Sequence, residues 1–183
     1  PVQQATSATD HLAYGSLFQW GRKGDGHELI TYTNGSTGTA ANGTTTTRPN
    51  ADTAANALFI TINSGNDDWR GTTHNDALWA TEASANNPCP VGFRVPTNAE
   101  LTTLVTSSSI TNSATAASSA MKFTVPGFRN HDSGSLGGVG SFGYYWSSSV
   151  DGSYAIFRNL YSGGTNTSGL YRADGYSVRC LKD

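Results

Sequence analysis

The stretch Tyr154-Ala155-Ile156-Phe157-Arg158-Asn159-Leu160-Tyr161 decides the fold class of this chain. Aromatic and branched residues dominate it, and Ser162-Gly163-Gly164 follows as a turn, so the pattern predicts a β-strand. Successive side chains along a strand point to opposite faces. One face would carry Ile156, Arg158 and Leu160, and the other Phe157, Asn159 and Tyr161. Both faces are partly apolar, so one of them is available to contact a partner rather than solvent.

The rest of the chain predicts several more short strands between glycine-rich turns. We expect these strands at 17–20, 58–62, 121–125, 143–149 and 176–181. Residues 33–57, which are rich in Thr, Asn, Gly and Ala, predict a long surface loop. One helix signal, without regular alternation of strands and helices, indicates an α+β fold with short antiparallel strands, few helices and long loops.

The clearest helix signal lies at residues 96–105. Thr97 and Glu100 have the spacing of a capping box, in which each side chain bonds the backbone N–H of the other residue. Three apolar residues follow at helical spacing and would face the core, namely Leu101, Leu104 and Val105. Residues 106–120 are rich in Ser, Thr and Ala, and they leave helix and loop both open.

Composition argues against several classes of protein. The 183 residues carry a formal net charge of −2, with 13% charged and 10% aromatic residues, which suits one folded domain. We expect a lead-in segment at residues 1–13 and the folded domain at residues 14–183. No basic cluster favours nucleic acid, and no apolar run reaches the roughly 18 to 20 residues of a membrane span. Low charge with abundant Gly, Ser, Thr and Asn indicates a secreted or surface protein.

Cys89 and Cys180 are the two cysteines of the chain. They form no CxxC pair and have no zinc-ligand spacing. We expect one disulfide between them, which would close a loop of about 90 residues and stabilise the fold by roughly 4 to 5 kcal/mol in the chain-entropy model. The alternative is a pair of buried thiols. A disulfide would agree with an extracellular, oxidising environment.

The sequence contains no familiar catalytic motif: no GxSxG elbow, P-loop, HExxH pair or dinucleotide-binding turn. The histidines, at positions 11, 27, 74 and 131, are scattered. We therefore expect neither an enzyme nor a cofactor, although a pocket that joins His27 or His131 with carboxylates would favour catalysis. The loop Asn66-Asp67-Asp68 could hold calcium through oxygen ligands or cap backbone amides, and we assign no metal ligand.

Aromatic side chains crowd the region between residues 144 and 176, where Gly, Ser, Asn, Thr and Asp separate them. This mixture is typical of antibody binding loops, in which Tyr gives contact area at low entropy cost while Ser and Asn adapt their hydrogen bonds. For Trp146 and Tyr176 we expect core positions. We expect exposed positions for Tyr154, Phe157, Tyr161, Leu170 and Tyr171.

Several ordered motifs resemble one family of bacterial proteins. They are YGSLFQWGRKGDGH at 14–27, CPVGFRVPT at 89–97, PGFR at 126–129, GSL at 134–136, GYYWSSS at 143–149 and RADGYSVRC at 172–180. Together, over about residues 14–181, they are similar to the Fibrobacter succinogenes major paralogous domain, which occurs in Bacteroidetes-type bacteria and their phages.

That resemblance implies a C-type-lectin-like fold, of the variety shared with formylglycine-generating-enzyme-like domains. Residues 94–100 are also similar to the RLPTEAEW element of that wider group, with Leu101 where the group has Trp. The catalytic cysteines of the generating enzyme have no counterpart, because Cys89 and Cys180 occupy the family's own paired positions. The EPN, QPD and WND sugar-binding motifs of calcium-dependent lectins are absent too. The resemblance therefore implies a binding domain without enzyme activity or calcium-mediated sugar binding.

Residues 150–179 further resemble the variable region of proteins that diversity-generating retroelements target. In that system, Asn-rich template positions are mutated to many residue types. The equivalent positions hold Tyr154, Ile156, Phe157, Asn159, Tyr161, Gly164, Asn166, Gly169, Leu170, Tyr171 and Asp174. The resemblance implies that ligand contacts come from Tyr154, Ile156, Phe157, Asn159, Tyr161, Asn166, Leu170, Tyr171 and Asp174.

These expectations combine into one hypothesis, a non-enzymatic ligand-binding or adhesion domain on a bacterial surface or a phage tail fibre. Its C-terminal patch would contact a host-cell surface protein or glycan, and its location would be extracellular, at the cell surface or on the virion. The alternative is a structural subunit of a surface polymer or fibre, with the aromatic patch buried at a chain–chain interface. An oligomer is compatible with either hypothesis.

Overall fold

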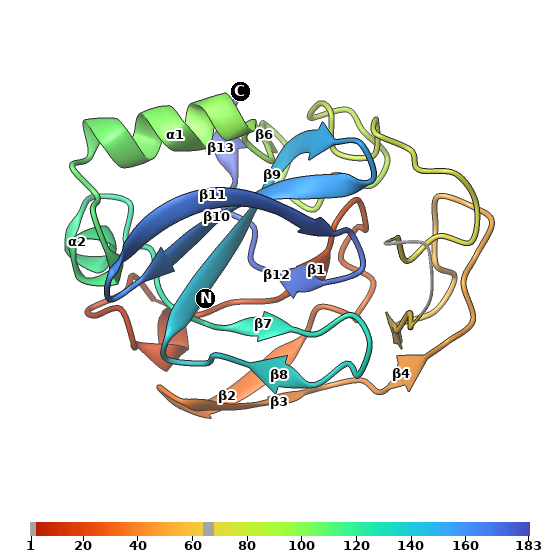
Figure 1. Cartoon of the computed structure of the whole chain (residues 1–183), viewed down its shortest axis with the longest axis horizontal. Helices are drawn as coiled ribbons and strands as arrows, with labels where there is room; N and C mark the ends of the chain where they lie inside the picture. Colours follow the sequence, from red (N-terminus) through yellow and green to blue (C-terminus); the bar gives the residue numbers. More distant parts are fainter. Residues whose placement is uncertain (1–2, 64–67) are drawn as a thin grey trace.

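Short antiparallel strands dominate the structure, a computed structural model that describes residues 3–63 and 68–183 (Figure 1). The elements in chain order are η1 (His11–Ala13), β1 (Phe18–Gln19), β2 (Ile30–Asn34), β3 (Thr37–Ala40), β4 (Thr44–Thr45), β5 (Phe59–Ile60), β6 (Phe93–Arg94), α1 (Asn98–Ser107), α2 (Ser113–Ser118), β7 (Phe128–Arg129), β8 (Leu136–Gly137), β9 (Phe142–Asp151), β10 (Tyr154–Tyr161), β11 (Gly164–Tyr171), β12 (Gly175–Tyr176) and β13 (Leu181–Lys182). The predicted α+β class with few helices is confirmed.

Two sheets contain the strands β7 to β12 of the C-terminal half of the chain, together with β1 from its N-terminal part. One has the strand order β11-β10-β9 and the other the order β1-β12-β7-β8, all antiparallel. In Figure 1 the β9–β11 sheet lies between the two α-helices and the β1-β12-β7-β8 sheet. Strand β10 is therefore the central strand of the β9–β11 sheet. Its exact predicted bounds, 154–161, are confirmed.

Helix α1 begins where the capping box predicts. The Thr97 hydroxyl accepts a hydrogen bond from the Glu100 backbone N–H at 3.3 Å, and the Glu100 carboxylate accepts one from the Thr97 backbone N–H at 2.8 Å. Leu101 and Val105 are buried on the side that faces the β9–β11 sheet. A second capping box, formed by residues 112 and 115, starts α2, so part of the ambiguous segment 106–120 is helical.

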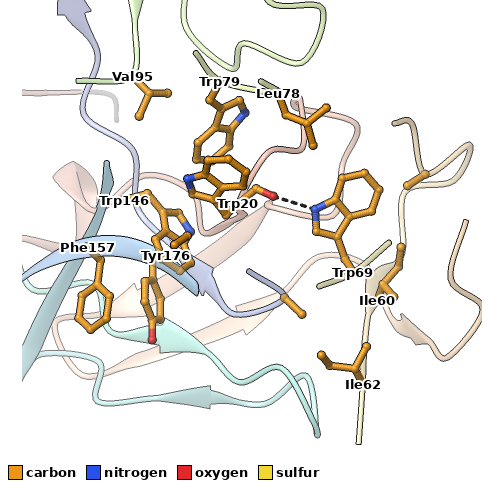
Figure 2. Close-up of a cluster of buried hydrophobic side chains, with 13 residues drawn as sticks. Trp20, Ile60, Ile62, Trp69, Leu78, Trp79, Val95, Trp146, Phe157 and Tyr176 are labelled. Atoms are coloured by element: carbon orange, nitrogen blue, oxygen red, sulfur yellow. Dashed lines mark hydrogen bonds between the residues drawn. The ribbon is translucent and has the colours of Figure 1, made fainter. Parts of the chain in front are cut away.

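Four fully buried tryptophans form the centre of the core (Figure 2). Each indole N–H donates to a backbone carbonyl at 2.7–2.8 Å, and the acceptors are the carbonyls of Ser147 for Trp20, Trp20 for Trp69, Asn86 for Trp79, and Phe18 for Trp146. Three of these bonds join segments separated by at least 49 residues. The tryptophans therefore fix the path of loops that have little secondary structure of their own.

Two expectations about the secondary structure of residues 33–125 were wrong. Residues 33–57 are not one long loop, because β2 and β3 form a hairpin there and β4 pairs in parallel with β5. The Asn34 side chain, which accepts from the Ser36 backbone N–H at 2.9 Å, makes the hairpin turn. Residues 121–125 form no strand, because Lys122 adopts a left-handed conformation with φ of 52° that interrupts the extended path.

The closing strand predicted at 176–181 is divided between two sheets. Tyr176 belongs to β12, whereas Leu181 belongs to β13, which pairs with β6. Between them, the Ser177 backbone bonds β9, donating to the Tyr144 carbonyl and accepting from the Trp146 N–H at 2.9 Å each. The chain thus changes partners within a few residues, which a simple alternating pattern does not reveal.

The lead-in segment packs on the domain rather than extending from it. Ala5 and Ala13 are buried, and the Val125 backbone N–H donates to the Ala8 carbonyl at 2.9 Å. Residues 3–13 therefore belong to the same folded unit as the remainder of the described chain.

The predicted disulfide is present. It joins Cys89 to Cys180 across a sequence separation of 91 residues and lies beside the paired strands β6 and β13. Within the parts of the chain that the structure describes, neither helix has the length and apolar character required to cross a membrane.

Removing the disulfide is expected to destabilise the fold strongly. The double variant Cys89→Ala/Cys180→Ala should lose up to about 4 to 5 kcal/mol of unfolding free energy, because its unfolded chain regains the entropy of an open loop. Urea unfolding with and without reductant measures this. Reductant should destabilise the wild type and leave the double variant unchanged, and equal wild-type stability in both conditions would contradict the prediction.

Candidate binding surface on the β10–β11 hairpin

The inner face of β10 belongs to the core. Phe157 is only 3% exposed, and its ring centroid lies 5.0 Å from that of Tyr176, 5.4 Å from that of Tyr144 and 6.0 Å from that of Trp146. Figure 2 shows Phe157 beside the stacked Trp146 and Tyr176 rings. The expectation that Phe157 is an exposed contact residue was therefore wrong, because the register places it opposite Trp146 on the core face.

The opposite face of β10 is covered as well over much of its length. Leu160 is fully buried in a cluster that includes Val105 of α1 and Ala116 of α2. The Arg158 guanidinium donates to the Thr102 hydroxyl of α1 at 2.8 Å. Asn159, on the same face as Phe157, is half-buried. The middle of β10 thus supports the fold on both faces and leaves contact residues only toward its ends.

One end of the hairpin exposes an aromatic row, which we define as Tyr154, Tyr171 and His131. The Tyr154 side chain is 40% exposed, and its ring centroid lies 5.8 Å from that of Tyr171, directly across the strand pair. The Tyr171 centroid lies in turn 4.4 Å from that of His131. Half-buried Ile156 adjoins Tyr154, with Gly169 of β11 beside both. This end therefore combines ring faces with an aliphatic edge.

The buried carboxylate of Asp174 fixes the position of His131 in the aromatic row by hydrogen bonds. Asp174 is 4% exposed and accepts hydrogen bonds from the His131 backbone N–H at 3.0 Å and from the His131 ring Nδ1 at 2.9 Å. The Tyr176 hydroxyl donates to the other Asp174 oxygen at 3.3 Å. The expectation that Asp174 contacts a ligand directly was wrong, because its carboxylate is turned inward to position His131.

Arg172 is a supporting residue that the sequence did not reveal. Its guanidinium is fully buried 4.8 Å from the Trp20 ring, pairs with Asp76 at 2.7 Å, and donates to the carbonyls of Gly152 and Ser153 at 3.0 Å each. Those carbonyls belong to the turn between β9 and β10. Arg172 therefore ties the exposed end of the hairpin to the tryptophan core, and the only sequence signal for it was its place in the motif at 172–180.

The remaining predicted contact residues do not join the aromatic row. Asn166 is exposed in the middle of β11, whereas Leu170 is half-buried against the core. Tyr161 lies at the turn end of the hairpin, 6.1 Å from the Phe142 ring, and with Phe142 lines a cavity of about 230 Å³. The structure thus groups Tyr154, Ile156 and Tyr171, and places Asn166 and Tyr161 apart from them.

Asp25, His27 and Glu28 are grouped closely enough to hold a metal ion, but their contacts are those of an internal network. The His27 Nδ1 lies 2.7 Å from Asp25, and its Nε2 accepts from the Gln19 backbone N–H at 3.0 Å. The Arg22 guanidinium, 2.7 Å from Asp25, already supplies the positive charge that a metal would bring. This donor set therefore fits an ion-pair network and does not fit a metal site.

The protonation of this network follows from its burial. Burial would raise the pKa of Asp25, but hydrogen bonds and charge from His27 and Arg22 lower it to about 2. Burial lowers the pKa of His27 despite the neighbouring carboxylates. A pocket of about 420 Å³ reaches Asp25 and Arg22 but is not lined by His27. His27 itself is fully buried, so its pairing with the carboxylates lies within the fold.

The calcium alternative concerned residues 66–68, of which Asn66 and Asp67 lie outside the described residues. Asp68 itself is buried, accepts from the Arg70 backbone N–H at 3.1 Å, and pairs with His74 at 3.0 Å. Its side chain acts as the backbone cap that the second alternative predicted.

Comparison with known proteins adds no relative. No protein-family model matches the chain, and neither the curated proteins nor the solved structures contain a match.

Two substitutions on β10 should show, by their different effects on the unfolding free energy, which side chain is buried and which is exposed. Phe157→Ala should lower the unfolding free energy by about 3 to 5 kcal/mol, because it leaves a cavity beneath Tyr176 and Trp146. Tyr154→Ala should change it by less than about 1 kcal/mol. Urea titrations followed by tryptophan fluorescence measure both values, and equal losses would contradict the burial difference.

The depressed pKa of His27 predicts acid sensitivity near neutral pH. Below the ordinary histidine pKa of 6.5, His27 is protonated in the unfolded chain and stays neutral in the folded chain, because burial lowers its pKa there. The free energy of unfolding therefore falls as pH falls. The unfolding free energy should decrease by up to about 1.4 kcal/mol per pH unit below about pH 6.5. His27→Gln, whose amide oxygen can still accept from Gln19, should flatten this slope. The prediction fails if the slope is the same in both proteins.

Proposed function

We propose that this chain is a non-enzymatic binding domain, and that the aromatic row with Ile156 contacts its ligand. The observation that carries the proposal is the placement of exposed Tyr154 against Tyr171 and His131, on a support of buried charges and tryptophans. Rigid aromatic anchors lose little side-chain entropy when they bind, so a small supported patch of this kind can bind effectively. Phe157 and Asp174 have a supporting role in this assignment.

The ligand class follows from the chemistry of the patch. Tyrosine rings offer an apolar face and a hydroxyl, and Asn166–Ser168, farther along β11, offer amide and hydroxyl groups. Such a surface suits a neutral, polar partner, either a glycan whose ring stacks on tyrosine or a host-cell surface protein. Exposed Asp151, which pairs with Tyr154 across β9 and β10, places a carboxylate beside the row and argues against a strongly acidic ligand.

The disulfide supports display outside the cell, because such bonds persist in oxidising environments. We place the domain on a bacterial surface or a phage tail fibre, extracellular, at the cell surface or on the virion. The motif resemblances support a C-type-lectin-like scaffold whose variable segment spans residues 150–179. Sequencing the neighbouring DNA tests the second point, since diversification requires a reverse transcriptase gene and a repeat that differs at adenines.

A binding screen tests the proposed function. The wild-type protein is applied to a glycan array and to a panel of host cells, and every hit is repeated with Tyr154→Ala and Tyr171→Ala. Each variant should weaken binding by about tenfold or more, since hot-spot aromatics cost at least 1 to 2 kcal/mol when truncated.

Phe93→Ala is the matched control, because Phe93 is an aromatic residue of similar exposure, 36%, on the separate strand β6. It should bind like the wild type. Unfolding curves must show that all variants are folded. The assignment of the aromatic row is overturned if Tyr154→Ala and Tyr171→Ala bind every hit as tightly as Phe93→Ala does.

A further inference from the structure

Strand β11 forms an open edge of the β11-β10-β9 sheet. Its only strand partner among the described residues is β10, to which it pairs over eight positions without a register shift. Asn166, Thr167 and Ser168 are exposed in succession, although alternate residues point to opposite faces of the sheet. Both faces and the outer edge are therefore accessible at the middle of this strand.

This edge lacks the features that keep sheets from pairing with one another. Natural edge strands are protected by charged side chains, proline, bulges or short length. The segment Gly164–Tyr171 has eight residues, none of them charged and none of them proline, and its pairing with β10 is regular. An edge of this kind is a template for a further strand.

The direction of its free hydrogen-bonding groups follows from the hairpin. Tyr161 pairs with Gly164 across the two-residue turn Ser162-Gly163, so these two residues exchange hydrogen bonds with each other. Hydrogen-bonded and non-hydrogen-bonded pairs alternate from there. The backbone groups of Thr165, Thr167, Gly169 and Tyr171 consequently point away from β10. The Tyr171 carbonyl accepts from the Asp174 N–H at 3.0 Å, and none of the described backbone hydrogen bonds outside the strand pairs engages Thr165, Thr167 or Gly169.

We propose that the occupant of this edge is a second copy of the chain, bound antiparallel with Thr167 on the two-fold axis. A two-fold axis perpendicular to a sheet keeps each side chain on its own face, so β11 can pair with itself only when a residue lies opposite its own copy. Thr167 is the outward-bonding residue nearest the middle of β11. Centring there pairs residues 164–170 of the two copies and leaves Tyr171, whose carbonyl already accepts from the Asp174 N–H, outside the pairing.

The side chains match in this register. Thr167 lies opposite Thr167 of the second copy, a favourable cross-strand pair, and Thr165 lies opposite Gly169 of the second copy. Leu170 lies opposite Gly164 of the second copy, so the larger side chain faces the smallest. No like charges meet along the strand, since it carries none. These matches favour a second copy over an unrelated strand.

The paired edges would join two three-stranded sheets into one continuous sheet. Because the axis is perpendicular to the sheet, the aromatic rows of both copies would face the same side. The inference concerns self-association and does not depend on whether the aromatic row binds a ligand.

Sedimentation of the wild-type protein from micromolar to millimolar concentration tests the proposal, together with two substitutions at the axis. Thr167→Pro removes an outward N–H that β10 does not use, and Thr167→Lys brings two like charges together. Thr103→Lys, on the exposed side of α1, is the control for added charge. Wild type and Thr103→Lys should dimerise with the same dissociation constant, and both Thr167 variants should raise it by about tenfold or more.

Hydrogen exchange supplies an independent readout, since the amides of Thr165, Thr167 and Gly169 should become protected as concentration rises. Circular dichroism verifies folding, and Thr167→Lys keeps the test decisive if the proline variant unfolds. A wild-type protein that stays monomeric at every concentration overturns the proposal. A dimer that neither Thr167 variant weakens overturns it as well.

Discussion

The fold depends on the hydrogen bonds that the buried indoles of Trp20, Trp69, Trp79 and Trp146 donate to backbone carbonyls. Most of the strands are only two residues long, so ladders of backbone hydrogen bonds hold little of the chain in place. Each tryptophan buries a large apolar ring and also satisfies a backbone carbonyl, which lies in a loop for Trp69 and Trp79 and in strand β9 or β1 for Trp20 and Trp146. Without these side chains, few contacts would fix the conformation of the described residues between β5 and β6.

The same arrangement supports the hairpin that we propose as the binding surface. Trp146 stacks on Tyr176 with 4.3 Å between ring centroids, and Phe157 packs against both from β10. Arg172 lies over Trp20 and holds the turn before β10. The aromatic row is therefore an outward extension of the core, and a ligand would meet side chains whose supports are already ordered. Such preorganisation lowers the entropy cost of binding.

Sequence reasoning succeeded where the signal was local. The capping box at Thr97 and Glu100, the strand at 154–161 and the disulfide all follow from neighbouring residues or from a single pair. It failed for Phe157 because both faces of β10 are apolar, and alternation does not say which face meets the core. Strand β11 was missed because its polar sequence has no hydrophobic period, and its partner β10 determines its conformation. The contact between His131 and Asp174 joins residues 43 positions apart, and no local sequence pattern predicts it.

The exposed triad Asn166–Ser168 adds almost nothing to the buried volume of the molecule, while the framework residues around it are fixed by several contacts each. Substitutions there should cost little folding free energy. Selection at these positions would therefore act mainly through the molecules that the protein binds. Within this one hairpin, some positions tolerate substitution while others are required for the fold. A lineage could explore many sequences at these positions while inheriting one unchanging architecture.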